Sequence, residues 1–232
     1  MTLLGVILTS NNRVFGIADG RAEMPGELGM GSSFERDKFN KSDSHPLMWG
    51  IIGDPESGLD FGPWLDDAYT VNSQETWPTF SNLVKTAWSE ITSMEVRRVR
   101  SNFDVNQGVL PQWLNLPSNC VVVTGFINGG TGVVATSRGG SATYHQPGVY
   151  FFGPWRQHVY AAWKVVQRRE NVTLGDFATL RDLLEPICDA LEHLYLPVNI
   201  WELFKDGQFK KLANDFQDTF DTRPNLYGGG TP

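Results

Sequence analysis

Stretches that favour strands and stretches that favour helices are segregated along this chain of 232 residues. Apolar runs of strand length come first, and a long helical pattern follows. Further strand runs, further helical sequence and a last strand complete the order. Because strands and helices do not alternate, the parallel βαβ pattern is not indicated. This order predicts an α+β protein in which two antiparallel sheets are covered by helices on their outer sides.

The expected strands are short apolar runs bounded by turn residues. They are Leu3 to Leu8, Val14 to Ala18, Leu47 to Ile52, Cys120 to Ile127, Gly132 to Thr136, Val149 to Phe152 and Val198 to Phe204. The turns Thr9-Ser10-Asn11-Asn12 and Asn128-Gly129-Gly130 predict two hairpins. Residues 20 to 33 are expected to form a loop.

Three helices are expected from apolar residues that recur at spacings of three and four. They include Phe80 to Val99, Trp155 to Gln167 and Phe177 to Leu194, with Trp88 and Trp163 on apolar faces. The sequences Gly62-Pro63-Trp64 and Gly153-Pro154-Trp155 echo each other. Each is expected to follow a strand and to precede helical sequence, since proline suits a first helical turn.

Composition excludes several classes of protein. Hydrophobic residues make up 41% of the chain and charged residues 19%, which is typical of a globular protein. A net charge of −7 argues against a nucleic-acid partner. No apolar run reaches about 18 residues and no basic leader opens the chain, so we expect a cytoplasmic protein without a membrane partner. Cys120 and Cys188 lie far apart and are expected to be reduced, buried thiols.

Sites for metals and cofactors are not expected. The four histidines have no ligand spacing, and Gly129 to Gly132 lacks the Lys-Ser/Thr of a phosphate-binding loop. Four acidic residues of the helical run from 177 to 194 would share one face, which predicts a solvated face in preference to a metal site. They are Asp182, Glu185, Asp189 and Glu192.

Thr2 is a candidate nucleophile because of its position. Met1 precedes a residue with a small side chain, which favours removal of Met1 by methionine aminopeptidase. The exposed threonine would then carry a hydroxyl and a free α-amine with a pKa near ~8, so it can act as nucleophile and base together. The alternative is that the chain begins Met-Thr by chance.

The order of motifs resembles proteasome β subunits and the HslV peptidase. Thr2 enters a strand, and the next strand ends in Asp19-Gly20-Arg21-Ala22, as Asp-Ser-Arg-Ala or Asp-Gly-Gln-Ala does in that family. Lys38 then precedes a strand that closes at Gly53, and later strands and helices follow in family order. The resemblance covers residues 2 to 207 and implies the four-layer αββα sandwich of N-terminal-nucleophile hydrolases.

The resemblance implies a role for each of four residues. Thr2 would be the nucleophile, and its α-amine the general base. Lys38 would lower the effective pKa of the Thr2 hydroxyl, and Asp19 would pair with Lys38. The backbone N–H of Gly53 would stabilise the oxyanion. Read alone, Asp19 and Gly53 are ordinary turn residues, and Lys38 or its neighbour Lys41 is an ordinary surface lysine.

Two parts of the family pattern are missing. The family has Gly-Ser-Gly at the second strand-to-helix step, whereas this chain has Phe152-Gly153-Pro154-Trp155. The family also has an Asp and, three residues later, a Ser before its last strand, where this chain has Leu191 and Leu194. Asp189 and Glu192 would replace them only if the helix end shifts. The α-amine would therefore lack its usual support.

The resulting prediction is a threonine peptidase that cleaves peptide bonds through an acyl-enzyme ester on Thr2. Its domain would span residues 1–207, followed by a partly mobile extension over 208–232. By resemblance, it would act on peptides or unfolded proteins, assemble as a homo-oligomeric ring or larger body, and use a separate ATPase unfoldase. The alternatives are a non-catalytic proteasome-like subunit and an amidase acting on a small molecule.

Overall fold

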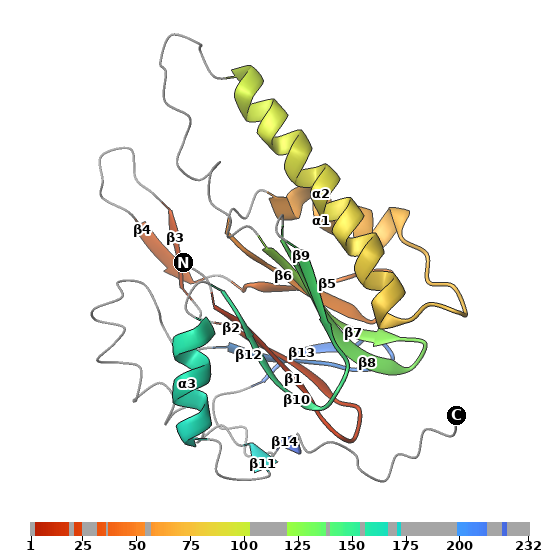
Figure 1. The fold of residues 1–232 in the computed structure, drawn as a ribbon, viewed down its shortest axis with the longest axis vertical. Coiled ribbons are helices and arrows are strands. Elements are labelled where there is room, and N and C mark those ends of the chain that lie inside the picture. The colour runs from red at the N-terminus through yellow and green to blue at the C-terminus, as the bar shows by residue number, and fades with distance from the viewer. Residues whose placement is uncertain are drawn as a thin grey trace.

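The fold is built around two antiparallel five-stranded sheets. The computed structural model describes residues 3–18, 21–24, 32–35, 37–53, 57–102, 120–137, 140–153, 156–166, 171–172, 199–212 and 220–221. Within these residues the structure is mixed α+β, as the order of strand and helix patterns predicts (Figure 1).

The first sheet has the strand order β10-β1-β2-β12-β13. Its strands are β10 (Gly148–Phe152), β1 (Leu4–Leu8), β2 (Val14–Ala18), β12 (Asn199–Leu203) and β13 (Phe209–Lys211). β1 and β2 form the expected hairpin, in which Leu4 lies opposite Ala18 and Leu8 opposite Val14. Every residue of β1 and of β2 is buried, which explains why both read as continuous apolar runs without alternation.

The second sheet has the strand order β5-β6-β7-β8-β9. Its strands are β5 (Phe39–Lys41), β6 (Leu47–Ile52), β7 (Cys120–Ile127), β8 (Gly130–Ser137) and β9 (Gly140–Tyr144). The expected hairpin between β7 and β8 is confirmed. Its turn residues Asn128 and Gly129 have φ values of 48° and 81°, which the primed hairpin turns require.

Two short strand pairs form separate two-stranded sheets. They are β3 (Arg21–Met24) with β4 (Ser32–Glu35), and β11 (Asn171–Val172) with β14 (Phe220–Asp221). The prediction of a loop over residues 20 to 33 is therefore wrong for β3 and for the start of β4. These strands carry Arg, Glu and Ser in place of the Val and Ile that mark a strand in a sequence.

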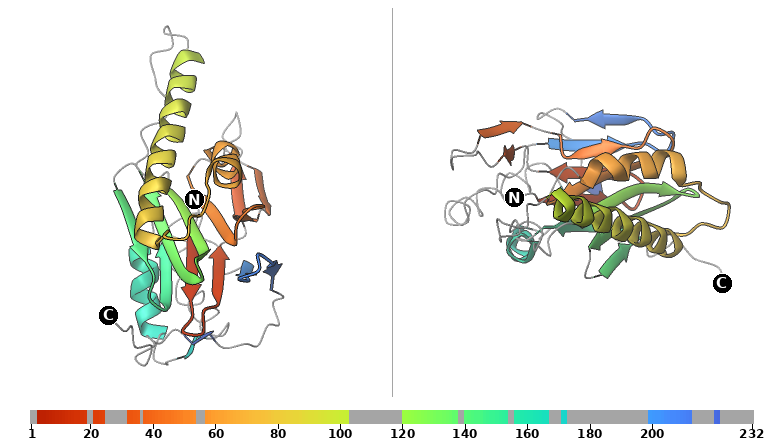
Figure 2. Two further views of the ribbon diagram at one scale, coloured as in Figure 1. Left: turned by 90° about the vertical axis from the view of Figure 1, so that its right-hand side faces the viewer. Right: turned by 90° about the horizontal axis from the view of Figure 1, so that it is seen from above.

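Helices lie on the outer side of each sheet. They are α1 (Ser57–Pro63), the π-helical segment η1 (Trp64–Ala68), α2 (Trp77–Asn102) and α3 (Arg156–Val166). α3 lies on one side of the sheets, and α1 and α2 lie on the other (Figure 1). α2 continues past the end of the sheet that it covers (Figure 2). The helix expected over 177 to 194 lies outside the described residues.

Three apolar clusters hold these elements together. Leu4, Val6 and Val14 of the first sheet meet Met48 and Val122 of the second in the core between the sheets. A second cluster joins α3 to the outer face of the first sheet, and a third joins α1 and α2 to the outer face of the second. The expected core positions of Trp88 and Trp163 are confirmed, because both side chains are buried in these outer clusters.

The expected echo between the two Gly-Pro-Trp sequences is wrong at the first of them. Gly62 and Pro63 end α1 and lead into η1, so they do not follow a strand directly, although helical sequence does follow them as expected. Proline cannot donate the usual backbone hydrogen bond, and a π turn is one way in which a helix accommodates such a break. Here the Tyr69 N–H donates to the Trp64 carbonyl at 3.0 Å, five residues back.

The first sheet continues past residue 207. β13 pairs with β12 through Leu203 and Phe209, and Leu212 is buried against the α3 side of the first sheet. The expected domain boundary after residue 207 therefore falls within the β12–β13 hairpin.

Candidate functional site

The strand ends that flank Thr2 and Asp19 lie together at one end of the first sheet. Leu4, which begins β1, lies opposite Ala18 at the end of β2 and opposite Phe152 at the end of β10. Thr2 and Asp19 themselves lie outside the described residues. The described residues thus fix where β1 starts and where β2 and β10 stop.

Lys38 directly precedes β5 of the second sheet, and its backbone comes close to this end of β1. A β-carbon added at Gly50 would lie 2.7 Å from the Lys38 carbonyl oxygen and 2.8 Å from Cδ1 of Leu4. Only glycine leaves room for the Lys38 backbone and the Leu4 side chain at the same place on β6. Gly50 therefore lets the two sheets approach each other beside Lys38.

The side chain of Lys38 is buried, with 8% of its surface exposed. Lysine is rarely buried to this degree in proteins, because removing its charge from water is unfavourable. The interpretation of Lys38 as an ordinary surface lysine is therefore wrong. Lys41, its neighbour at the other end of β5, is half-buried.

An ion pair ties the segment before β5 to the first sheet. Nζ of Lys211 on β13 lies 2.8 Å from Oδ1 of Asp37, the residue before Lys38. The same ammonium lies 5.7 Å from the ring centroid of Trp201 on β12. Both charged side chains are exposed, so the pair contributes about 1 kcal/mol or less to stability. The ion pair matters for position, because it places Asp37, and so the backbone beside Lys38, next to β13.

Gly53 ends β6 in a conformation that favours glycine. Its φ is 118°, and the residue is exposed. Gly153 follows β10 in the same way, with a φ of 131°. Each sheet therefore presents a strand that stops at a glycine with positive φ, and such glycines turn the backbone sharply at the sheet's end. This correspondence between Gly53 and Gly153 was not predicted, because the repeated Gly-Pro-Trp sequence pairs Gly153 with Gly62 instead.

Cys120 is the described thiol at this end of the second sheet. It begins β7 opposite Ile52, the residue before Gly53, and forms no disulfide. The expectation of a reduced and buried thiol is confirmed for Cys120 in part, since the side chain is half-buried; Cys188 lies outside the described residues. Burial raises the pKa of the Cys120 thiol to about 12, although the nearby positive charge of Arg156 and a backbone hydrogen bond from Thr136 oppose the rise. A thiol held protonated is a poor nucleophile.

We expect Cys120 to resist alkylation in the folded protein. With a pKa of about 12, the thiolate fraction at pH 8 is on the order of 10⁻⁴, so iodoacetamide should react roughly 1,000-fold more slowly than with an ordinary cysteine. The measurement is adduct mass against time for a Cys188→Ser variant, with the same variant in urea as the fast-reacting control. Equal rates in the two conditions would contradict the raised pKa.

The sign of the pH dependence follows from the same shift. Because the fold favours the protonated thiol, Cys120 leaves the free energy of unfolding unchanged below pH ~8.5, the ordinary thiol pKa. Its contribution then falls as the pH rises toward the folded-state pKa of about 12.

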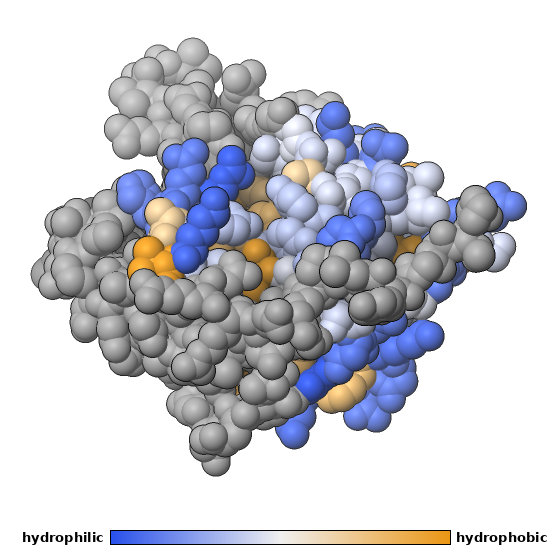
Figure 3. Space-filling model, turned by 60° about the horizontal axis from the view of Figure 1, so that its bottom comes forward, coloured by the Kyte–Doolittle hydropathy of each residue, from blue (hydrophilic) through white to orange (hydrophobic). Residues whose placement is uncertain are grey.

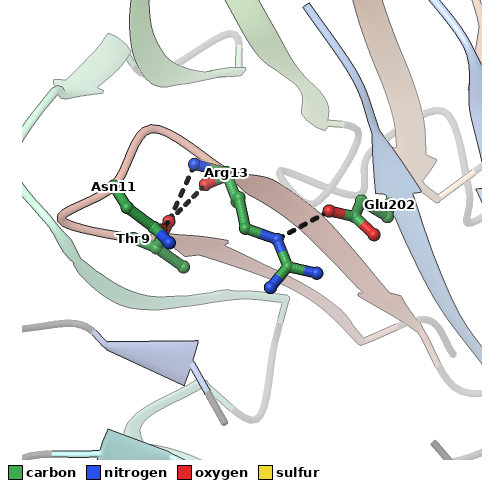
Figure 4. Close-up of polar contacts among 4 residues, drawn as sticks. All are labelled: Thr9, Asn11, Arg13 and Glu202. Carbon is green, nitrogen blue, oxygen red and sulfur yellow. Dashed lines mark hydrogen bonds and ion pairs between the residues drawn. The ribbon is translucent and has the colours of Figure 1, made fainter. Parts of the chain in front are cut away.

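A buried charged pair lies at the other end of the first sheet and has a structural explanation. Nε of Arg13 donates to Oε1 of Glu202 at 2.8 Å, and Glu202 is 4% exposed (Figure 4). The Arg13 N–H also donates to Oγ1 of Thr9 at 2.7 Å, and the Thr9 hydroxyl donates to Asn11 at 2.6 Å. These contacts close the β1–β2 turn and join it to β12, far along both strands from Lys38.

A second polar group surrounds the start of α2. Thr79 donates to Oε1 of the buried Glu75 at 2.6 Å, and Asn128 donates to the Glu75 carbonyl at 2.9 Å. The hydroxyl of Tyr69 is buried with no hydrogen-bond partner within the described structure. Burial and the negative charge of Glu75 both raise the pKa of Tyr69, so it stays neutral. These contacts join the β7–β8 turn to the start of α2.

The described part of the chain holds no group of three or more His, Cys, Asp and Glu side chains arranged for a metal ion. None of its helices combines the length and the apolar character needed to cross a membrane. The acidic residues from Asp182 to Glu192 lie outside this part.

The described surface in view in Figure 3 is mostly hydrophilic, with small hydrophobic patches between polar residues. Five large apolar side chains are notably exposed among the described residues: Leu83, Met94, Tyr144, Val165 and Phe204. They come from α2, β9, α3 and the β12–β13 turn and do not mark one interface.

Comparison with known proteins assigns no family to this site: no protein-family model matches the chain, and neither does any curated protein.

Proposed function

We propose that this chain is a proteasome-like threonine peptidase with the four-layer αββα fold of N-terminal-nucleophile hydrolases. One observation carries most of the proposal. Lys38 is buried, and its backbone lies beside Leu4, two residues after Thr2. A buried ammonium next to a candidate nucleophile is the arrangement that lowers a hydroxyl's effective pKa.

The chemistry would proceed by acyl transfer. Oγ of Thr2 attacks the carbonyl carbon of a peptide bond while the Thr2 α-amine takes the hydroxyl proton. The resulting oxyanion accepts a hydrogen bond from the Gly53 N–H, and the charge of Lys38, held by Asp19, favours the ionised hydroxyl. Cleavage of the carbon–nitrogen bond releases an amine, which takes the proton. Water then hydrolyses the ester on Thr2 and restores the enzyme.

The proposed partners follow from the same family resemblance. Substrates are peptides or unfolded proteins, and the chain assembles with copies of itself into a ring or larger body in the cytoplasm. An unfolding step that uses ATP belongs to a separate protein.

A non-catalytic proteasome-like subunit is the second candidate. The observation that favours it is the strand end at Phe152 and Gly153, where Pro154 stands in place of the family's serine. Without that hydroxyl, the α-amine has one fewer group to orient it. A protein of this kind would keep the fold and the assembly but would not react at Thr2.

Intact mass measurement with and without a peptide epoxyketone, a probe that reacts covalently with the hydroxyl and the α-amine of an N-terminal threonine, tests the proposal. We expect the native chain to have lost Met1 and to gain one probe adduct, and we expect Thr2→Ala to gain none. A chain that retains Met1 and takes no adduct would overturn the peptidase and leave the non-catalytic subunit. An adduct that persists in Thr2→Ala would point to another nucleophile.

A further inference from the structure

β9 forms an exposed edge of the second sheet. Among the described strands it pairs with β8 alone. Ser141 and Tyr144 are exposed and the other residues of β9 are half-buried, so the strand lies at the surface. All five residues of β9 are uncharged, and none is proline. Edges that stay unpaired in natural proteins usually carry Lys or Pro or are very short, because an open edge invites another strand.

The other edges of the two main sheets differ from β9. β13 and β5 have three residues each, and both include lysine: Lys210 and Lys211 in β13, and Lys41 in β5. β10, at the remaining edge, is mostly buried. Among the described edges of these two sheets, β9 is therefore the one that is exposed and carries no protection against pairing.

The register of β8 determines which backbone groups of β9 face outward. In an antiparallel ladder, opposite residues alternate between pairs that exchange two backbone hydrogen bonds and pairs that exchange none. The two-residue loop Asn128-Gly129 sets this alternation along β8, because the residues that flank such a loop form a bonded pair. Carried across to β9, the alternation makes every second residue bond to β8, starting at Gly140. The backbone N–H and C=O groups of Ser141 and Thr143 therefore point away from β8.

An apolar flank of α2 lies above the same edge. α2 packs on β8 and β9, and α1 lies beside it against β6. Trp88 of α2 contacts Phe61 of α1, with ring centroids 5.8 Å apart, so this side of α2 faces α1. Leu83 and Met94 lie about 120–140° around the helix from Trp88, at about 3.6 residues per turn. Their side chains are 44% and 49% exposed, on the flank of α2 that faces away from α1 and toward the β9 edge.

We propose that β9 pairs with β9 of a second copy of this chain, in antiparallel orientation about a two-fold axis. The pairing that uses every residue of β9 is centred on Ala142, so that Ser141 of each copy exchanges hydrogen bonds with Thr143 of the other. The second sheets of the two copies then form one continuous sheet. The same axis brings the two α2 flanks together and covers Leu83 and Met94.

A second copy fits this surface because both of its parts are self-complementary. The outward groups of β9 match those of the same strand inverted, and an apolar helix flank meets an identical flank. β9 carries no charge, which favours contact here between two copies that each have a net charge of −7. The inference does not depend on the proposed peptidase, and it adds a two-fold contact to whatever ring contacts the assembly has.

A disulfide across the two-fold axis tests the register. Ala142 would lie opposite itself in a pair without hydrogen bonds, with Cα atoms about 4.5 Å apart, which a disulfide can span. We expect Ala142→Cys, with Cys120 and Cys188 replaced by serine, to form a covalent dimer on oxidation with copper phenanthroline. Ser141→Cys is the matched control, because its two copies would lie diagonally, about 7–8 Å apart, and should cross-link far less.

Sedimentation velocity measures the association itself. Leu83→Glu places a charge in the contact between the α2 flanks, and Thr143→Pro removes one outward N–H while leaving the bonds to β8. Each should weaken dimerisation about 10-fold or more. Val165→Glu makes the same kind of change at an exposed apolar residue of α3 and should leave dimerisation unchanged.

Two results would overturn the proposal. One is a wild-type chain that sediments as a monomer at about 100 µM, well above the Kd expected of a specific interface. The other is an oligomer that both Leu83→Glu and Thr143→Pro leave intact, because the copies would then associate through another surface. Far-UV circular dichroism checks that Thr143→Pro is folded; if it is not, Leu83→Glu and the cysteine pair decide the outcome.

Discussion

Replacing Lys38 with methionine should slow the reaction of Thr2 with an epoxyketone probe about 100- to 1,000-fold. In the proposed site the buried ammonium favours the ionised hydroxyl, and a positive charge in a water-poor environment acts more strongly than one at the surface. Lys38 is 8% exposed, so solvent does little to screen it. The measurement is the rate of adduct formation followed by intact mass.

The stability of the same variant shows whether it remains folded when its labelling is measured. Methionine keeps much of the volume of lysine, but it would leave the carboxylate of Asp19, the proposed partner of Lys38, without its cation, so the free energy of unfolding in urea should fall. Lys41→Met is the matched control. Lys41 is half-buried at the other end of β5, and its replacement should leave labelling near the wild-type rate. Unchanged labelling in Lys38→Met would remove Lys38 from the site.

Elements with strong apolar patterns could be predicted from the sequence. The strands β1, β2, β6 and β7 are short, mainly apolar runs between turn residues, and each is almost wholly buried. α2 buries Trp77, Phe80, Val84 and Trp88 at spacings of three and four, so the spacing of these apolar residues in the sequence predicts the helix. In these elements local preference and tertiary burial agree.

The elements that sequence reasoning missed lack such a pattern. β9 consists of Gly140-Ser141-Ala142-Thr143-Tyr144 at the edge of the second sheet, where only one side pairs. Its strand geometry comes from its pairing with β8, and small polar residues alone do not indicate it. α1 contains Gly62 and Pro63, which both disfavour a helix interior. Packing of Phe61, and of Leu65 in the η1 segment that follows, into the outer cluster outweighs that local preference.

The candidate site divides in the same way. Lys38 and Gly53 could be proposed because a family order of motifs surrounds them in the sequence. The burial of Lys38 depends on the approach of β1 and β6 at Gly50, which no local pattern reveals.

Gly125→Ala should destabilise the fold by about 4 kcal/mol or more. Gly125 lies on β7 with a φ of 144°, a conformation that other residues rarely adopt. An added β-carbon would also lie 2.2 Å from the Pro46 carbonyl oxygen and 2.9 Å from the Leu47 Cα. Both atoms belong to the backbone that enters β6, and the Pro46 oxygen already accepts a hydrogen bond from Phe126 at 2.9 Å. Relief of the clash would therefore pull β6 away from β7.

Gly140→Ala separates the two causes of this loss. Gly140 has nearly the same φ, 148°, but an added β-carbon there would meet nothing within 4 Å. Its replacement should cost only the backbone strain, about 1–3 kcal/mol. Urea unfolding of both variants gives the difference, which measures the steric conflict between β6 and β7. If the two variants lose equal stability, the conflict with Pro46 is relieved without cost and β6 does not depend on close contact at Gly125. A larger loss in Gly125→Ala would instead show that this contact holds the strand on which Gly50 and Gly53 are placed.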